Sequence, residues 1–114
     1  MNVLFWEEEN RLLDAESMAE LTRQIVARCR PAKIYLFGSH AKGLVRPSSD
    51  IDLCLVVQTD DARKLNQDLQ LNLDVDASLD FVIYTPAAWD KHVGDPGSFA
   101  YQIQSKGVLL HGGQ

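Results

Sequence analysis

The sequence predicts a small α/β (α+β) domain, in which helices cover one face of a mixed β-sheet of three or four strands. Two observations lead to this fold. Short apolar runs of strand length lie at Lys33–Phe37, Asp52–Gln58 and Leu79–Tyr84, and segments with helical spacing precede, separate and follow them. The length of 114 residues suits one domain, predicted over 1–114 with its core at about 32–84.

The first predicted helix covers Glu16–Arg28, because apolar side chains recur there every three or four residues: Met18, Leu21, Ile25 and Cys29. Pro31 stops this helix, and the strand Lys33–Phe37 follows. The segment from Ser39 to Val45 has room for only one or two helical turns before a loop rich in proline and serine.

The second half alternates in the same way. Asp52–Gln58 is apolar without alternation, which predicts a strand that is buried on both faces. A helix is predicted over Asp60–Leu71 with Thr59 as its N-cap, and a third strand over Leu79–Tyr84. Three elements then complete the chain: a helix from Thr85-Pro86 to His92, a helix over Phe99–Lys106 that Gly107 ends, and an edge strand at Val108–Leu110.

Two carboxylates, Asp50 and Asp52, stand one residue apart at the start of the second strand. Side chains at this spacing point to one face of a strand, so both can converge on one point. Their mutual repulsion is costly unless a cation lies between them, and hard oxygen ligands suit Mg²⁺. Upstream, Gly38 permits close backbone approach, and Ser39 adds a hydroxyl and the start of a short helix, which attracts phosphate. Together these residues predict a metal–triphosphate site.

A third carboxylate has three candidates, Asp74, Asp76 and Asp80. The first two lie in a polar connection, where exposed aspartate is common. Asp80 lies inside an apolar strand, where a carboxylate is expensive unless it is paired or bound to metal. We therefore expect Asp80 to be the third acid.

These residues resemble a known pattern. The segments Gly38-Ser39, Ala41-Lys42-Gly43 and Ser49-Asp50-Ile51-Asp52-Leu53, with the later Asp80, are similar to the polymerase-beta-like nucleotidyltransferase superfamily. Within it the chain looks like a minimal nucleotidyltransferase. It departs from the usual pattern at Lys42, where arginine is common, and at His40.

The resemblance implies a function and its parts. It implies a transferase that uses ATP and two Mg²⁺ ions, with Asp50, Asp52 and Asp80 as metal ligands and catalytic residues. Gly38, Ser39 and Lys42 would contact the nucleotide. The family further implies a helical HEPN-domain partner, a toxin to which this antitoxin transfers AMP on tyrosine.

Two other functions stay open. The chain could neutralise a toxin by covering it without catalysis, as a binding-only antitoxin or a catalytically weak nucleotide-binding module. It could also modify a small molecule, although such enzymes usually need more chain to enclose their substrate. The three acids favour the enzyme, since a binding protein has no physical reason to keep carboxylates that repel one another.

Composition limits the remaining possibilities. A net charge of −5 argues against direct binding of nucleic acid, which requires a basic face. No apolar run is long enough for a membrane span, and no signal peptide is visible, so we expect a cytoplasmic protein. Cys29 and Cys54 are expected to be free buried thiols. The aromatic residues from Trp89 to Tyr101 are expected to contribute to the core or to a partner interface.

Overall fold

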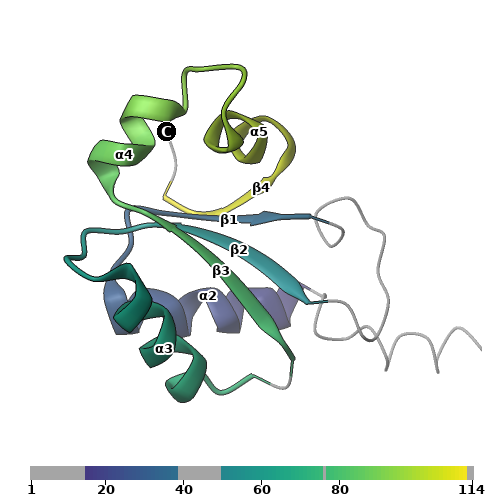
Figure 1. The fold of residues 1–114 in the computed structure, drawn as a ribbon. Coiled ribbons are helices and arrows are strands. Elements are labelled where there is room, and N and C mark those ends of the chain that lie inside the picture. Colours follow the sequence, from purple (N-terminus) through teal and green to yellow (C-terminus); the bar gives the residue numbers. More distant parts are fainter. Residues whose placement is uncertain (1–14, 39–49, 76, 113–114) are drawn as a thin grey trace, which may run out of the picture.

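The structure is a computed structural model that describes residues 15–38, 50–75 and 77–112. Along the chain these residues form eight helices and strands, shown in Figure 1: α2 (Ala15–Cys29), β1 (Lys33–Phe37), β2 (Ile51–Val56), α3 (Ala62–Asn72), β3 (Leu79–Tyr84), α4 (Pro86–His92), α5 (Phe99–Lys106) and β4 (Val108–His111). The short helix predicted from Ser39 to Val45 lies outside the described residues.

The four strands form one mixed sheet in the order β3-β2-β1-β4. The central strand β1 is antiparallel to both β2 and β4, whereas β2 and β3 are parallel. Parallel neighbours need a crossover connection, and α3 supplies it. The predicted mixed sheet is therefore confirmed, including its edge strand near the C-terminal end.

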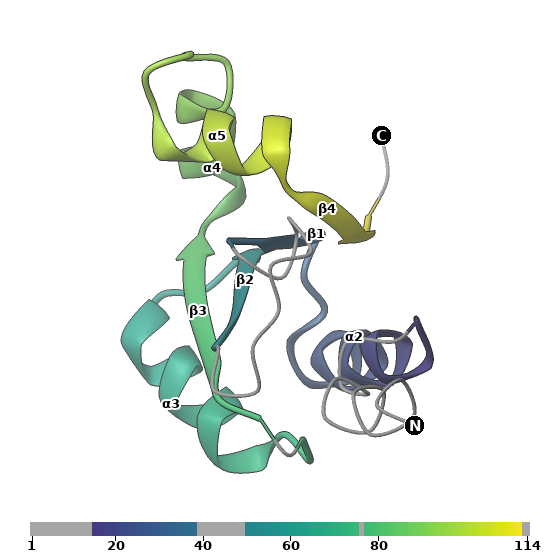
Figure 2. The same cartoon turned by 90° about the vertical axis from the view of Figure 1, so that its right-hand side faces the viewer.

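Helices cover both faces of this sheet, and the prediction that they lie on one face was wrong. In Figures 1 and 2, α2 and α3 lie on one side of the strands and α4 and α5 on the other. The reason is visible in β1, where successive side chains are buried on opposite faces: Ile34 and Leu36 pack with the α2 side, and Tyr35 packs with the α4 side. Each apolar face needs its own layer of helices.

The larger core lies between the sheet and the α2–α3 layer. It joins one stripe of α2 to inward side chains of all three N-terminal strands and to Leu69 of α3. Its buried residues are Met18, Leu21, Ile25, Ile34, Leu36, Ile51, Leu53, Leu55, Val57, Leu69 and Phe81. The smaller core lies under α4 and α5, and consists of Tyr35, Cys54, Val56, Trp89, Ala100 and Ile103.

Local capping explains where the helices begin. Thr85 and Ser98 each accept a hydrogen bond from a backbone N–H three residues later, so α4 and α5 begin as expected, with Pro86 at the first turn of α4. In α3 the N-cap is Asp61 and not Thr59. The Asp61 carboxylate accepts from the Lys64 N–H at 3.1 Å, and the Thr59 hydroxyl instead accepts from the Asp61 N–H.

Side-chain contacts join α2 to α3 and to the connection before β3. Arg28 of α2 donates two hydrogen bonds, of 2.9 and 2.8 Å, to the carboxylate of Asp68 in α3. Gln24 of α2 bonds to both backbone groups of Asp74, in the connection to β3. None of the helices that the structure describes is long and apolar enough to cross a membrane.

Candidate functional site

The predicted acids lie where β1 ends and where β2 and β3 begin. In the strand register Asp52 is opposite Phe37 of β1 on one side and opposite Asp80 of β3 on the other. Neighbouring strands lie about 4.7–4.9 Å apart, and opposed residues of a pair share a face. Asp52 lies on the same face as Cys54 and Val56, which is the face that α4 and α5 cover further along the sheet.

Asp50 lies immediately before β2 and is exposed. The next residue fixes the start of the strand, because the N–H of Ile51 donates to the carbonyl of Ser78 at 2.9 Å. This bond ties the approach to β2 to the approach to β3. Asp50, Asp52 and Asp80 are therefore brought to one edge of the sheet by two adjacent strand starts.

Gly38 joins this edge from β1. Its φ of +78° lies in the left-handed region, which favours glycine, and a Cβ at this position would overlap the Oδ2 atom of Asp52 and lie 3.2 Å from its Cγ. The turn thus passes directly over the Asp52 carboxylate. Glycine is required here both by the backbone conformation and by the space.

The described acidic side chains do not form a metal-binding cluster. No group of three or more histidine, cysteine, aspartate or glutamate side chains within residues 15–38, 50–75 and 77–112 is arranged to hold a metal ion. Asp52 is half-buried, whereas Asp50 and Asp80 are exposed. Asp80 was expected to be costly within an apolar strand, but it does not carry a burial cost, because it lies at the exposed start of an edge strand.

Several residues predicted for the site lie outside the part of the chain that the structure describes. Ser39 and Lys42, expected to contact the nucleotide, lie outside the described residues, as does Asp76. The alternative third acid Asp74 lies in the connection before β3, outside the paired region that brings Asp80 opposite Asp52.

Comparison with known proteins decides the family. The family model described as polymerase beta nucleotidyltransferase matches residues 20–113, which is most of the chain. The chain belongs to this nucleotidyltransferase family. A proposed nucleotidyltransferase from Sulfolobus solfataricus, solved by crystallography, has the same fold, with a TM-score of 0.58 and 18% sequence identity over 91% of this chain and 83% of that one. No curated protein matches the chain.

The donor atoms of this nucleotidyltransferase domain suit a hard divalent cation by their chemistry, although the described side chains are not arranged around one point. Three carboxylates at one sheet edge offer only oxygen ligands, the type that Mg²⁺ prefers. The close passage of Gly38 over Asp52 keeps one of these carboxylates against the turn. The family itself works on nucleotides with divalent metals, in agreement with this chemistry.

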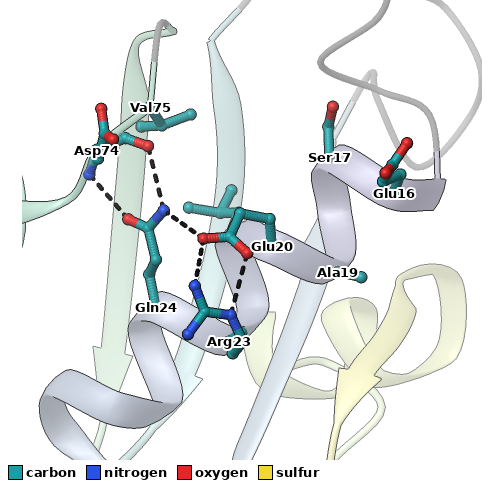
Figure 3. Close-up of a pocket in the computed structure, with 9 residues that line it drawn as sticks. Glu16, Ser17, Ala19, Glu20, Arg23, Gln24, Asp74 and Val75 are labelled. Atoms are coloured by element: carbon teal, nitrogen blue, oxygen red, sulfur yellow. Dashed lines mark hydrogen bonds and ion pairs between the residues drawn. The ribbon is translucent and has the colours of Figure 1, made fainter.

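Several hollows lie beside the described residues of the nucleotidyltransferase domain. One, of about 690 Å³, lies between α2 and the connection before β3; Asp74 lines it, whereas Gly38, Asp50, Asp52 and Asp80 do not. Figure 3 shows that its polar side chains bond to one another: Glu20 accepts from Arg23 and Gln24, and Gln24 bonds to Asp74. The Glu20 contacts lie within α2, and the two bonds between Gln24 and Asp74 hold α2 against the connection before β3.

A smaller hollow, of about 240 Å³, adjoins the acidic edge at Gly38. Its other walls come from β1 and α5: Phe37, Phe99, Gln102, Ile103 and Lys106. The sequence motif did not predict that these residues line a hollow. The α5 residues are far from Gly38 in sequence, and Phe37 belongs to the strand that precedes the motif. Only the packing of α5 beside the end of β1 brings them together.

The two cysteines take no part in this site. Both are free. Burial raises the pKa of the Cys54 thiol to about 12, so it remains protonated near neutral pH and is not a nucleophile. The prediction of buried free thiols is confirmed for Cys54, whereas Cys29 is half-buried.

Proposed function

We propose that this domain is an Mg²⁺-dependent adenylyltransferase that moves AMP from ATP to a partner protein of the HEPN type, as the antitoxin of a toxin–antitoxin pair. The observation that supports catalysis is the meeting of Gly38, Asp52 and Asp80 at one sheet edge, in a chain of the nucleotidyltransferase family. The partner comes from the resemblance of the motif to minimal nucleotidyltransferases.

In this proposal Asp50, Asp52 and Asp80 hold two Mg²⁺ ions, and Ser39 and Lys42 contact the triphosphate. Bound Mg²⁺ would offset the triphosphate charge and polarise the α-phosphate. Gly38 allows the phosphates to approach the backbone, since it carries no Cβ over Asp52.

Asp80 takes a second role as the base. Its carboxylate is exposed, so it can meet a hydroxyl that arrives from solvent or from a partner. The hydroxyl oxygen bonds to the α-phosphorus, its proton passes to Asp80, and the bond from the α-phosphorus to the bridging oxygen breaks. Pyrophosphate leaves, and the acceptor carries AMP.

A labelling experiment tests the proposal. The domain and a HEPN-domain protein, recovered together as a complex, are incubated with Mg²⁺ and ATP that is radiolabelled at the α-phosphate. We expect label on the HEPN protein, and none when the label is at the γ-phosphate. Asp50→Asn and Asp52→Asn should each reduce transfer by more than about 100-fold, because changes around metal ligands alone cost about 10–100-fold.

Each alternative function has its own outcome. A complex that neutralises the toxin but never carries label would show a binding-only antitoxin and overturn the enzyme. Label found only on added small hydroxyl compounds would identify a small-molecule transferase. Near-normal transfer by either asparagine variant would refute the assignment of Asp50 and Asp52.

A further inference from the structure

The hollow at Gly38 has two aromatic walls. The rings of Phe37 and Phe99 meet edge to face, with centroids 5.6 Å apart and planes at 86°. Edge-to-face contact fixes the orientation of both rings. Phe99 nevertheless remains 50% exposed, so part of its surface is available to a ligand.

Polar groups complete the same hollow. Lys106, in the last turn of α5, contributes a cation, and Gln102, one turn earlier, contributes an amide. The Gln102 Nε2 donates to the carbonyl of Pro96 at 3.5 Å, the long limit for a hydrogen bond, so a ligand could replace this contact at little cost. An apolar slot with a few polar groups at its rim is the usual form of a small-molecule site.

The size and position of the hollow limit the kind of ligand that it can bind. Pockets for whole drug-sized molecules measure about 300–1000 Å³. At about 240 Å³ this hollow has room for one ring system rather than for a complete nucleotide. Gly38 lines the hollow and also touches the space over Asp52, so a ligand that lies in the hollow continues directly into the acidic edge.

We propose that the hollow formed by Phe37, Phe99, Gln102 and Lys106 binds the base of the nucleoside triphosphate, with the base stacked on Phe99. This inference rests on the proposed function and adds the part of the site that holds the base. The ring stacks on Phe99, because every nucleobase presents a π-face to an aromatic side chain. Gln102 and Lys106 donate to acceptor atoms on its edge, and the phosphates pass Gly38 toward the acids.

The test separates the base from the phosphates. Binding of ATP and of inorganic tripolyphosphate, each with Mg²⁺, is measured by calorimetry for the domain and for Phe99→Ala. We expect the variant to bind ATP at least about fivefold more weakly, the lower end of base-stacking contributions, and to bind tripolyphosphate unchanged. Leu71→Ala is the matched control, because Leu71 is an apolar side chain that is 82% exposed and does not line the hollow.

Other outcomes overturn the inference in distinguishable ways. If Phe99→Ala keeps full ATP affinity but requires more protein acceptor for transfer, the hollow holds the acceptor side chain and not the base. If Phe99→Ala fails to fold by circular dichroism, Lys106→Ala and Gln102→Ala replace it, and unchanged ATP affinity in both refutes the site. If the unaltered domain binds neither ATP nor tripolyphosphate, the proposed function itself fails.

Discussion

At the scale of single residues, Gly38 sets the geometry of the candidate site. Its positive φ turns the chain at the end of β1, and its missing side chain leaves room for the Asp52 carboxylate. Any other residue would have to move either the turn or the carboxylate. A glycine that looks like an ordinary turn residue in sequence thus controls the shape of the acidic edge.

Replacement of this glycine should therefore damage both stability and activity. We expect Gly38→Ala to lower the free energy of unfolding by about 1–3 kcal/mol, the usual cost of a strained backbone position. AMP transfer should fall with it, because Asp52 must shift. Urea unfolding and the transfer assay measure the two effects. Gly94→Ala is the control, since nothing lies within 4 Å of a Cβ at that position. Equal effects of the two substitutions would contradict the inference that Gly38 is required by its backbone conformation and by the space beside Asp52.

The buried thiol of Cys54 and the half-buried thiol of Cys29 predict how the free energy of unfolding depends on pH. Burial raises the pKa of Cys54 to about 12, and burial together with the nearby Asp68 charge raises that of Cys29 to about 11. Thiols in the unfolded chain ionise near pH 8.5, so between about pH 8.5 and 11 the unfolded state releases protons that the folded state keeps. The free energy of unfolding should fall as pH rises through this range.

Urea midpoints measured between about pH 8 and pH 10 would show this slope. Cys54→Ala removes the more strongly shifted thiol, so its slope should be smaller even if the variant is less stable at every pH. An identical slope in the variant would show that Cys54 does not titrate in the expected way.

At the scale of elements, the start of β3 is held in place by side chains from both helices of one layer. Gln24 of α2 bonds to both backbone groups of Asp74, at 3.2 and 2.8 Å. Gln70 of α3 donates to the carbonyl of Leu79 at 2.9 Å. These bonds fix the register in which Asp80 lies opposite Asp52. The third acid is thereby positioned by residues that carry no chemistry of their own.

This arrangement distinguishes two neighbouring acids. Asp80→Ala should eliminate AMP transfer, whereas Asp74→Ala should leave it nearly unchanged, because Asp74 contributes only its backbone to the contact with Gln24. Both side chains are exposed, so both variants should fold, as circular dichroism can verify. Loss of transfer in Asp74→Ala, with Asp80→Ala still active, would show that the third acid was assigned to the wrong strand position.

At the scale of the whole molecule, the second helical layer depends on Trp89. Its ring stacks on Tyr35 of β1 and meets the edge of Tyr84 of β3, with both centroid distances at 5.4 Å. Trp89 is only 2% exposed, so the expectation that it could serve as an interface residue is not supported. Of the aromatic residues from Trp89 to Tyr101, Phe99 is the exposed one.

The two aromatic residues should therefore respond differently to truncation. Trp89→Ala should cost about 3–5 kcal/mol, the range for large buried aromatic side chains, which is a large share of a typical total stability of about 5–15 kcal/mol. Phe99→Ala should change stability far less, since half of its surface is already exposed. Thermal and urea unfolding of both variants check this difference, and similar losses would show that Phe99 belongs to the core.

The local features of this protein could be predicted from its sequence. The strands Lys33–Phe37 and Leu79–Tyr84, the Thr85 cap with Pro86 and the terminating Gly107 are encoded within a few residues, and the structure has them where they were predicted. The second strand was predicted at Asp52–Gln58 and lies at Ile51–Val56. The pair Asp50 and Asp52 was visible for the same reason, because its spacing at the start of one strand is itself the signal. The long-range arrangement could not be predicted in this way. The face on which each helix packs, the register of Asp80 against Asp52 and the meeting of α5 with Gly38 depend on contacts between segments that are distant in sequence, and no local pattern encodes such contacts.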